Sequence, residues 1–473
     1  MCSRPLINIR PAVLALMTAL LVVCGCSNRG PNSQSGSTTG TARTPPVNLS
    51  GNKPSELARP AEPAPTGNVA VATAPAGSAA ETATSPNATR PSPTEPLAAP
   101  SDPSDTSASW PNFRNGTDLR GVAGTTLPEK LELLWQLETH DGVTSTAAIS
   151  GGFVYVAELS GLIRRLDLHS GQELWKYRTI ESQDLEEFAA GFNAPVTLSD
   201  TGVFVGDEEG KLHALDRESG RPLWKPFETG DLIKGGVTIL PPDPASGAPR
   251  LLFGSHDGHL YCLNAATGEQ IWKFDTRGPV NGSQAIHGEH TFVSGCDQPI
   301  LRVVNTNTGE QHAEIPLDGS LLVASPALVG DVLYFGTPDG EVIALDWIQQ
   351  QRVWTYKDPG RKQEIHSSPA VTDKLAIIGS RDKRLHAIDR LTGERVWAFE
   401  TKGPIDSSPV VVGERIFFGS ADRNVYAVDF SGQEVWKHNT GHRISASPAV
   451  GEGHLVIGCE GSGGAILCFG AMK

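Results

Sequence analysis

The chain carries the sequence Ala387-Ile388-Asp389-Arg390-Leu391-Thr392-Gly393-Glu394-Arg395-Val396-Trp397. Variants of this sequence recur at intervals of roughly 40 residues, a period typical of solenoids, propellers and other arrays of one repeated unit. Complete copies also end at Trp175, Trp224, Trp272, Trp354 and Trp436, and a degenerate copy, in which the indole is missing, ends at Ala313.

Each copy reads as a strand, a turn and a second strand. The alternating apolar residues of 384–388 are typical of a strand. Asp389 and Thr392 can hydrogen-bond the local backbone and Gly393 tolerates a positive φ, which together predict a tight turn. An indole at a fixed place after the turn can cover the neighbouring unit, with its N–H bonded to a backbone carbonyl.

This pattern resembles the tryptophan-docking motif of PQQ-type β-propeller repeats, where PQQ is pyrroloquinoline quinone. The resemblance extends from about Trp110 to Lys473 and implies that each indole lies against the adjacent blade. We therefore predict an all-β, eight-bladed PQQ-like β-propeller, or a seven-bladed one if the degenerate unit is not a blade. The outer-strand positions are Trp135, Trp175, Trp224, Trp272, Ala313, Trp354, Trp397 and Trp436.

The two ends of the repeat region complement each other. Residues Leu133–Glu138 match only the last strand of a unit, whereas the residues from Ser447 to Phe469 supply three strands. We predict that the N-terminal strand completes the last sheet and closes the ring, which protects edge strands. The propeller then comprises residues 131–473. Residues 109–130 are interpreted as an N-terminal lid that packs Trp110 and Phe113 on the propeller.

The first 25 residues are interpreted as a lipoprotein signal peptide, with a basic start and an apolar segment too short to span a bilayer. Val23-Cys24-Gly25-Cys26 resembles a bacterial lipobox, which makes Cys26 the predicted lipidated residue. An ordinary secreted protein cut nearby is the alternative. Ser27 follows the acceptor, and by resemblance to enterobacterial sorting this favours the periplasmic side of the outer membrane.

Residues 26–108 are rich in Pro, Ser, Thr, Ala and Gly. Such a segment cannot bury enough apolar surface to offset its conformational entropy, so we predict a disordered tether. The formal net charge of −14 argues against nucleic acid as a partner, because phosphate binding needs a basic surface.

The cysteines after the signal segment show no zinc-site spacing. Cys459 and Cys468 lie on consecutive predicted strands and could form a disulfide. The other interpretation, that they are small buried thiols like Cys262 and Cys296, is favoured.

The start of each innermost strand is predicted to supply one residue to a ring at a mouth of the central channel. Polar members of this ring could bind an anion, a sugar or a peptide terminus, and His366 beside Asp406 has the residue types of a general base. Polar residues that are merely solvated at a wet mouth are the alternative. The ring is predicted to contain Thr144, Phe192, Lys234, Asn281, Val323, His366, Asp406 and Ser445.

Two insertions interrupt the repeats, an acidic one at residues 181–187 and a Pro-rich one at residues 241–249. Loops that exceed the repeat are places where propellers often bind partners, although neutral drift in loop length is equally compatible with both.

The chain also resembles the propeller lipoproteins of the outer-membrane β-barrel assembly machinery. This resemblance implies a lipid-anchored, monomeric propeller head that binds envelope or outer-membrane proteins as a scaffold, without cofactor, metal or catalytic residues. One alternative is a quinoprotein alcohol or sugar dehydrogenase using PQQ and calcium, but the sequence has no adjacent cysteine pair and no evident calcium ligand set. Another is an envelope sensor or adhesion head.

Overall fold

The computed structural model describes residues 109–295 and 298–472, and all regular secondary structure in these ranges is β-strand. Among these residues, no helix with the length and apolarity of a membrane span occurs. The predicted signal peptide, the lipid acceptor Cys26, the whole of the predicted tether, and Cys296 lie outside the described residues.

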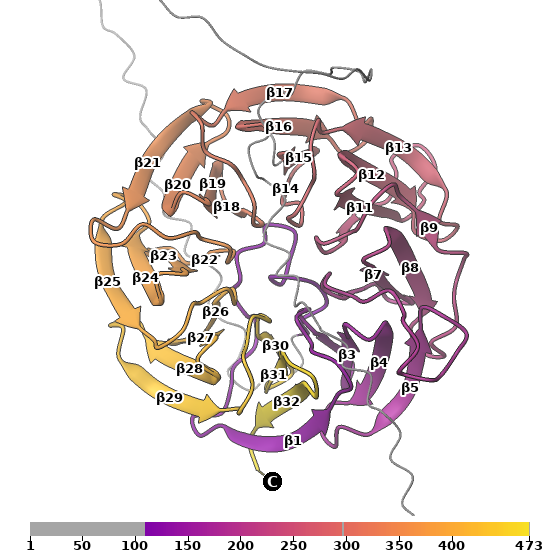
Figure 1. Cartoon of the computed structure of the whole chain (residues 1–473). Coiled ribbons are helices and arrows are strands. Elements are labelled where there is room, and N and C mark those ends of the chain that lie inside the picture. The colour runs from indigo at the N-terminus through magenta and orange to yellow at the C-terminus, as the bar shows by residue number, and fades with distance from the viewer. Residues whose placement is uncertain (1–108, 296–297, 473) are drawn as a thin grey trace, which may run out of the picture. The chain divides into compact units, whose positions relative to one another are not determined.

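The strands form eight four-stranded antiparallel sheets arranged around a central channel (Figure 1). We number these blades 1 to 8 along the chain. From channel to rim, blade 1 has β2 Ala148–Ser150, β3 Phe153–Ala157, β4 Leu162–Asp167 and β5 Glu173–Arg178; blade 2 has β6 Thr197–Leu198, β7 Gly202–Gly206, β8 Lys211–Asp216 and β9 Phe227–Glu228; blade 3 has β10 Thr238–Leu240, β11 Arg250–Ser255, β12 His259–Asn264 and β13 Gln270–Asp275; blade 4 has β14 Ile286–His287, β15 His290–Val293, β16 Ile300–Asn305 and β17 Gln311–Pro316.

The second half of the ring repeats this arrangement. Blade 5 has β18 Ala327–Val329, β19 Val332–Gly336, β20 Glu341–Asp346 and β21 Gln351–Lys357; blade 6 has β22 Ala370–Val371, β23 Leu375–Gly379, β24 Arg384–Asp389 and β25 Arg395–Glu400; blade 7 has β26 Val410–Val412, β27 Arg415–Gly419, β28 Asn424–Asp429 and β29 Glu434–Asn439; blade 8 has β30 Ala449–Gly451, β31 His454–Cys459 and β32 Ala465–Gly470.

The ring is closed by strand β1, Glu132–Glu138, which is the outermost strand of blade 8. It pairs antiparallel with β32, with Leu133 opposite Phe469 and Glu138 opposite Ala465. In Figure 1 this indigo strand lies along the outside of the yellow C-terminal strands. The predicted eight-bladed propeller with N-terminal closure is confirmed, and the seven-bladed alternative is wrong, because the degenerate unit forms a complete four-stranded blade 4.

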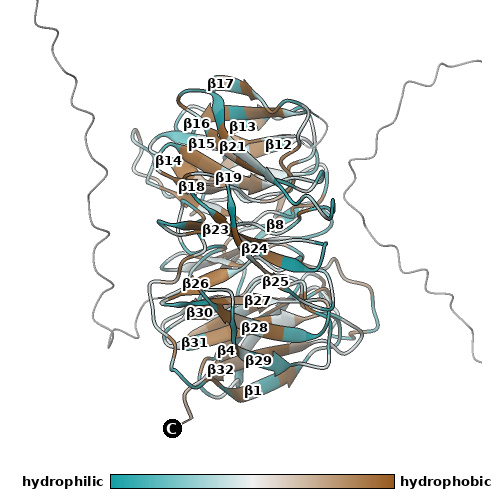
Figure 2. Ribbon diagram, turned by 90° about the vertical axis from the view of Figure 1, so that its left-hand side faces the viewer, coloured by the Kyte–Doolittle hydropathy of each residue, from teal (hydrophilic) through white to brown (hydrophobic). Residues whose placement is uncertain are grey.

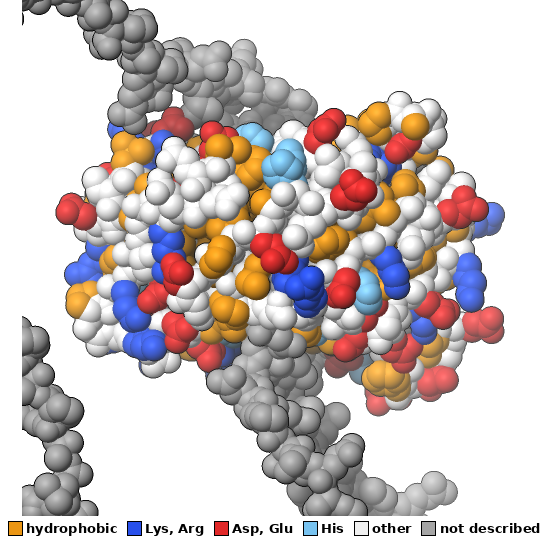
Figure 3. All heavy atoms as spheres, turned by 90° about the horizontal axis from the view of Figure 1, so that it is seen from above, with side chains coloured by type: hydrophobic (Ala, Val, Ile, Leu, Met, Phe, Trp, Pro, Cys, Tyr) orange, Lys and Arg blue, Asp and Glu red, His pale blue; other side chains and the backbone are white. Residues whose placement is uncertain are grey.

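The core lies between neighbouring blades. Middle strands such as β24 bury four consecutive residues, whereas outer strands such as β25 alternate exposed and half-buried ones. Figure 2 shows the apolar residues, in brown, concentrated in the strands, and polar residues, in teal, at turns and along parts of the outer strands. The rim seen in Figure 3 mixes acidic, basic and apolar side chains without a field of one sign.

Seven of the eight blade junctions are covered by an indole whose N–H donates to a backbone carbonyl of the next blade, at 2.8–3.3 Å. Trp354 of blade 5, for example, donates to the Arg390 carbonyl of blade 6 at 2.9 Å. A Cβ on Gly393 would lie 2.7 Å from the Trp354 ring, and Gly393 has φ +76°. The turn therefore needs glycine for its backbone and for the indole stacked on it. The donors are Trp135, Trp175, Trp224, Trp272, Trp354, Trp397 and Trp436.

The junction between blades 4 and 5 is built differently. Ala313 replaces the indole in blade 4, and Gln350, with φ +54°, lies in the blade 5 turn where other blades have glycine. Trp347 of blade 5 instead packs back onto blade 4, with its ring centroid 5.2 Å from that of Phe292 and 5.4 Å from that of His290. An indole still fills the junction, but it comes from the opposite blade.

The segment before β1 makes one circuit of the channel at the end of the inner strands. Trp110 forms an isolated bridge with Ile149 of blade 1, and the carbonyls of Thr117, Asp118 and Arg120 accept backbone N–H bonds from blades 4, 5 and 6 in turn. A parallel bridge from Val122 then reaches blade 7.

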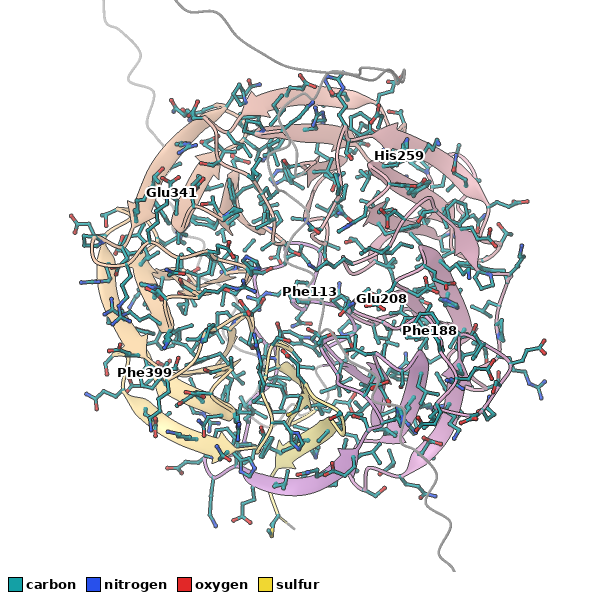
Figure 4. All side chains as sticks on the ribbon, in the orientation of Figure 1. Phe113, Phe188, Glu208, His259, Glu341 and Phe399 are labelled. Atoms are coloured by element: carbon teal, nitrogen blue, oxygen red, sulfur yellow. The ribbon has the colours of Figure 1, made fainter. Side chains whose placement is uncertain are left out.

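Three side chains of this segment contribute to the packing of the channel. Trp110 is fully buried, and Phe113 lies near the centre of the ring in Figure 4. Arg114 is also buried, and its guanidinium donates to the carbonyls of Pro369 and Pro409 at 2.6 and 2.7 Å. Burial lowers the pKa of Arg114 to about 9.

Candidate functional site at the channel mouth

The opposite mouth of the channel is formed where the inner strands begin. The apolar residue at each start is fixed by a backbone bond to the preceding blade, as in Ile365 N–H to the Thr337 carbonyl and Ile405 N–H to the Ser380 carbonyl. A Cβ on Gly379 would lie 2.4 Å from Cγ2 of Ile405, so the aliphatic side chain packs directly on the neighbouring blade. The residue that follows each apolar anchor is thereby placed at the mouth.

Blade 2 departs from the predicted ring. The Phe192 N–H donates to the Glu158 carbonyl, which is the bond made by the apolar anchor in other blades, and Phe192 is fully buried with its ring 5.4 Å from that of His213. Placing Phe192 in the ring is therefore wrong by one residue. Asn193 takes that place, and its Oδ1 accepts a hydrogen bond from the Thr144 hydroxyl at 2.8 Å.

Blades 6 to 8 contribute an alternating chain of acids and bases. Arg381 contacts Glu364 at 3.1 Å and Asp406 at 2.9 Å. Arg443 lies 3.7 Å from the same Asp406 and 3.4 Å from Glu460. Every carboxylate in this chain faces at least one guanidinium, so the mouth is a fixed polar surface on this side.

His366 belongs to this row of charged side chains. Its nearest partner is Glu364 and not Asp406, which the sequence suggested. Its Nε2 lies 3.0 Å from Glu364, whereas Asp406 is bonded to Arg381. Burial lowers the pKa of His366, and the charge of Arg381 lowers it further. The imidazole is therefore neutral at pH 7 and acts as a hydrogen-bonding group in the surface.

The remaining ring positions are less connected. The Asn281 Oδ1 contacts the His256 ring, Val323 is buried and interrupts the polar ring, and Ser445 is half-buried on blade 8. Lys234 is half-buried and makes no ion pair with any residue that the structure describes. This side of the mouth offers an unneutralised cation beside neutral polar groups.

A ladder of serines lies behind the ring and was not anticipated from the sequence. Each hydroxyl accepts a hydrogen bond from the backbone N–H of the equivalent residue in the preceding blade, at 2.7–3.1 Å. The repeated Ser-Pro pairs were the available signal, because the serine recurs three residues after the apolar anchor. The ladder links blades 3 to 8 through Gly236, Ser283, Ser325, Ser368, Ser408 and Ser447.

A family comparison identifies the propeller. The model of the outer membrane protein assembly factor BamB family matches residues 159–231, 228–367 and 348–469, which is more than half of the chain. The chain belongs to the BamB family. Its resemblance to this PQQ-like propeller family, predicted from the repeats, is confirmed.

Individual relatives are distant. BamB of Shewanella oneidensis is 24% identical over 260 residues, which cover 51% of this chain and 64% of that protein. The chain spans less than two thirds of the length of the curated relatives that it matches. The crystal structure of BamB from Moraxella catarrhalis has a TM-score of 0.57 at 19% identity, covering 73% of this chain and 98% of that one.

The fold is also shared with enzymes. Quinohemoprotein alcohol dehydrogenase from Comamonas testosteroni has a TM-score of 0.61 at 14% identity, covering 77% of this chain and 81% of that one. At the mouth of this BamB-family chain, Glu364, Asp406 and Glu460 are each paired with an arginine and do not form the convergent oxygen cage that calcium needs.

One buried cluster has metal-ligand residue types. Within the described residues, Asp358, Asp382 and His386 bring their ligand atoms within 4.8 Å of one another. However, Arg395 contacts Asp358 at 2.9 Å, and the His386 Nε2 lies 3.0 Å from Asp382. These contacts make the cluster a network of paired polar groups between blades 5 and 6.

The predicted cysteine alternatives are resolved in favour of buried thiols. Cys459 lies opposite Ala465 and Cys468 opposite Val456, and both thiols are free and buried. The disulfide alternative is wrong, because the strand register does not bring the two sulfurs together. Burial raises the pKa of Cys459 to about 12, which makes it an inert core residue.

The two insertions lie at opposite ends of their blades. Residues 241–249 join β10 to β11, where the Asp243 carbonyl accepts the Gly247 N–H in a closed turn. Residues 181–187 lie in the connector from β5 to β6, which leads to the start of an inner strand and therefore to the mouth face. Only the second insertion can therefore take part in a surface shared with the polar ring.

Proposed function

We propose that this chain is a protein-binding scaffold of the cell envelope that acts in outer-membrane protein assembly and uses neither a cofactor nor catalysis. Membership of the BamB family over most of the propeller carries the proposal. A stable interface usually takes about 800 Å² of surface from each partner.

The chemistry of the mouth supports binding. Charges that are already paired within one protein are held in one conformation, so less side-chain freedom is lost when a partner binds. Arg381 and Arg443 are held in this way, while Lys234 remains available to a carboxylate of the partner. Such a pattern favours selective recognition of one protein surface over tight binding of a small molecule.

The location in this proposal rests on the start of the sequence. A lipid on Cys26 would anchor the head on the periplasmic side of the outer membrane, and residues 26–108 would serve as its tether. Envelope and outer-membrane proteins are then the partners within reach.

Affinity purification of the full, tagged chain from detergent-solubilised envelopes of its source organism tests the proposal. We expect barrel-assembly proteins to be enriched, and a double Arg381→Glu, Arg443→Glu variant to lose at least nine tenths of that enrichment. A Lys225→Glu, Lys437→Glu variant, which reverses two rim charges, is the matched control. Equal enrichment with an empty tag would contradict the proposal. Saturable PQQ binding with dye-linked alcohol oxidation would replace it by the dehydrogenase function.

A further inference from the structure

The connector into blade 2, which joins β5 to β6, is longer than its counterparts because extra residues are inserted into its turn. In five other connectors a Thr hydroxyl donates to the carbonyl two residues later, at 2.6–2.9 Å, as from Thr401 to Gly403. In the blade 2 connector the Thr179 hydroxyl donates to the Ala190 carbonyl at 3.2 Å. The backbone therefore leaves the standard turn after Thr179 and rejoins it at Ala190, with residues 181–189 added between.

The added residues, which we call the 181–189 loop, are held in place from below. The buried guanidinium of Arg178 donates to the carbonyls of Ser182, Asp184 and Glu187. The last loop residue, Ala189, is buried against the hairpin turn of blade 1, where a Cβ on Gly161 would lie 2.8 Å from it. Three carbonyls bound to one buried cation give the loop a defined shape.

This held loop presents an aromatic ring to solvent. Phe188 is 78% exposed, the largest value for a bulky apolar side chain in the described residues. In Figure 4 it lies in the same sector as Glu208, farther from the channel. Single exposed apolar side chains are common on protein surfaces. Phe188 differs because its loop is held in one shape by Arg178 and is rich in carboxylates.

The surroundings of the ring are acidic. Residues 179–191 contain four carboxylates and no Lys or Arg. The imidazole of His140 contacts Glu186 at 3.3 Å, and Glu208 extends the acidic character toward the mouth. By contrast Leu391, which is 70% exposed, lies in an ordinary blade turn beside Arg390. The acidic residues of the loop are Glu181, Asp184, Glu186 and Glu187.

We propose that the 181–189 loop is a docking element whose Phe188 inserts into an apolar pocket bordered by Lys or Arg on a partner protein. The inference rests on the proposed function, that the chain binds envelope proteins, and adds a second contact, on the connector into blade 2, to the polar ring of the mouth. Charge complementarity selects the partner. Four carboxylates around the ring disfavour an anionic bilayer, and a formal net charge of −14 disfavours a second copy of this chain.

Site-specific photocrosslinking identifies the occupant. A photoreactive phenylalanine analogue is placed at position 188 of the full chain in its source organism, with position 391 as the matched exposed control. We expect a discrete protein adduct at 188 only, with a contact peptide containing apolar residues next to Lys or Arg. Four results would contradict the proposal that this loop docks a partner protein: a lipid adduct, an adduct with a second copy, a contact peptide without basic residues, or no adduct.

Binding measurements with that cross-linked protein, purified, test the roles of the ring and the charges. We expect Phe188→Ser to weaken binding by about thirtyfold, as for an interfacial hot spot, with an unchanged melting temperature. Leu391→Ser should change affinity less than twofold. Replacing the four loop carboxylates by Gln should weaken binding at least tenfold at low salt. Equal effects of Phe188→Ser and Leu391→Ser would overturn the inference.

These experiments distinguish failure of the docking-loop proposal from failure of the proposed function in outer-membrane protein assembly. An adduct with a basic-rimmed protein unrelated to outer-membrane assembly supports the docking loop and contradicts the proposed setting. Loss of the adduct at 188, with barrel-assembly proteins still co-purifying, contradicts the loop alone.

Discussion

The junction between blades 4 and 5 differs from the other seven, and the difference shows what each junction requires. Elsewhere, an indole on the outer strand donates to the next blade, and six of those indoles stack on a turn glycine. At the exceptional junction the indole and the glycine are both missing, as Ala313 and Gln350. Trp347 fills the space from the other side. In six junctions the indole and the glycine behave as one unit, whereas Trp436 docks without a turn glycine. A junction therefore needs a packed ring more than a particular direction of packing.

The largest expected effect is loss of a docked indole. Trp354→Ala removes a ring that is 8% exposed together with its hydrogen bond to Arg390, and we expect the free energy of unfolding to fall by about 3 kcal/mol. Urea titration measures this. The neighbouring exposed Val353→Ala should cost less than about 0.5 kcal/mol. Similar losses for both variants would show that the indoles do not hold the ring together.

Removal of Trp347 tests whether reversed packing is equivalent. Its Nε1 has no hydrogen-bond partner among residues 109–295 and 298–472, so Trp347→Ala loses apolar contacts but no indole bond within this part of the chain. We expect a loss of about 2 kcal/mol, smaller than for Trp354→Ala by roughly the net contribution of one hydrogen bond. A loss equal to or larger than that of Trp354→Ala would mean that the exceptional junction is held by the same forces as the others.

The glycine half of the unit is tested by two opposite substitutions. Gly393→Gln places a side chain at φ +76° and within 2.7 Å of the Trp354 ring, and we expect it to destabilise the chain by about 2 kcal/mol. The reverse change, Gln350→Gly, should alter the free energy of unfolding by less than about 1 kcal/mol, since no indole rests on that turn. Calorimetric melting of both variants compares them directly. Equal and opposite shifts would refute the pairing of glycine with the indole.

The smallest expected effect is a pH dependence at the exceptional junction. Burial and the neighbouring His312 and His287 lower the pKa of His290, while Glu289 opposes this. A histidine with a lowered folded-state pKa stabilises the folded state above its unfolded pKa of about 6.5, and this contribution is lost as the pH falls further. We expect His290→Asn to flatten the decline in urea midpoint between about pH 7 and pH 5. A slope identical to that of the unchanged chain would contradict this.

Several features were predictable because each depends on a local, repeated pattern. The Asp-x-x-Thr-Gly turns, the regular indoles and the incomplete units at both ends led to eight blades and to the pairing of Leu133–Glu138 with Ala465–Phe469. The mouth ring was predicted from the same spacing. It failed at Phe192, because the 181–189 loop removes the regular distance between the Thr of the connector and the apolar anchor.

The remaining features depend on contacts between residues far apart in the chain. Nothing in the local sequence of Arg114 indicates that its guanidinium reaches Pro369 and Pro409, or that Arg381 contacts Asp406 of the next blade. Repetition and alternation of residue types suffice to specify strands, turns and their number, because strand alternation and turn hydrogen bonds involve residues only a few positions apart. The pairing of charges at the mouth and the reversed Trp347 were decided only when the folded ring brought separate blades into contact.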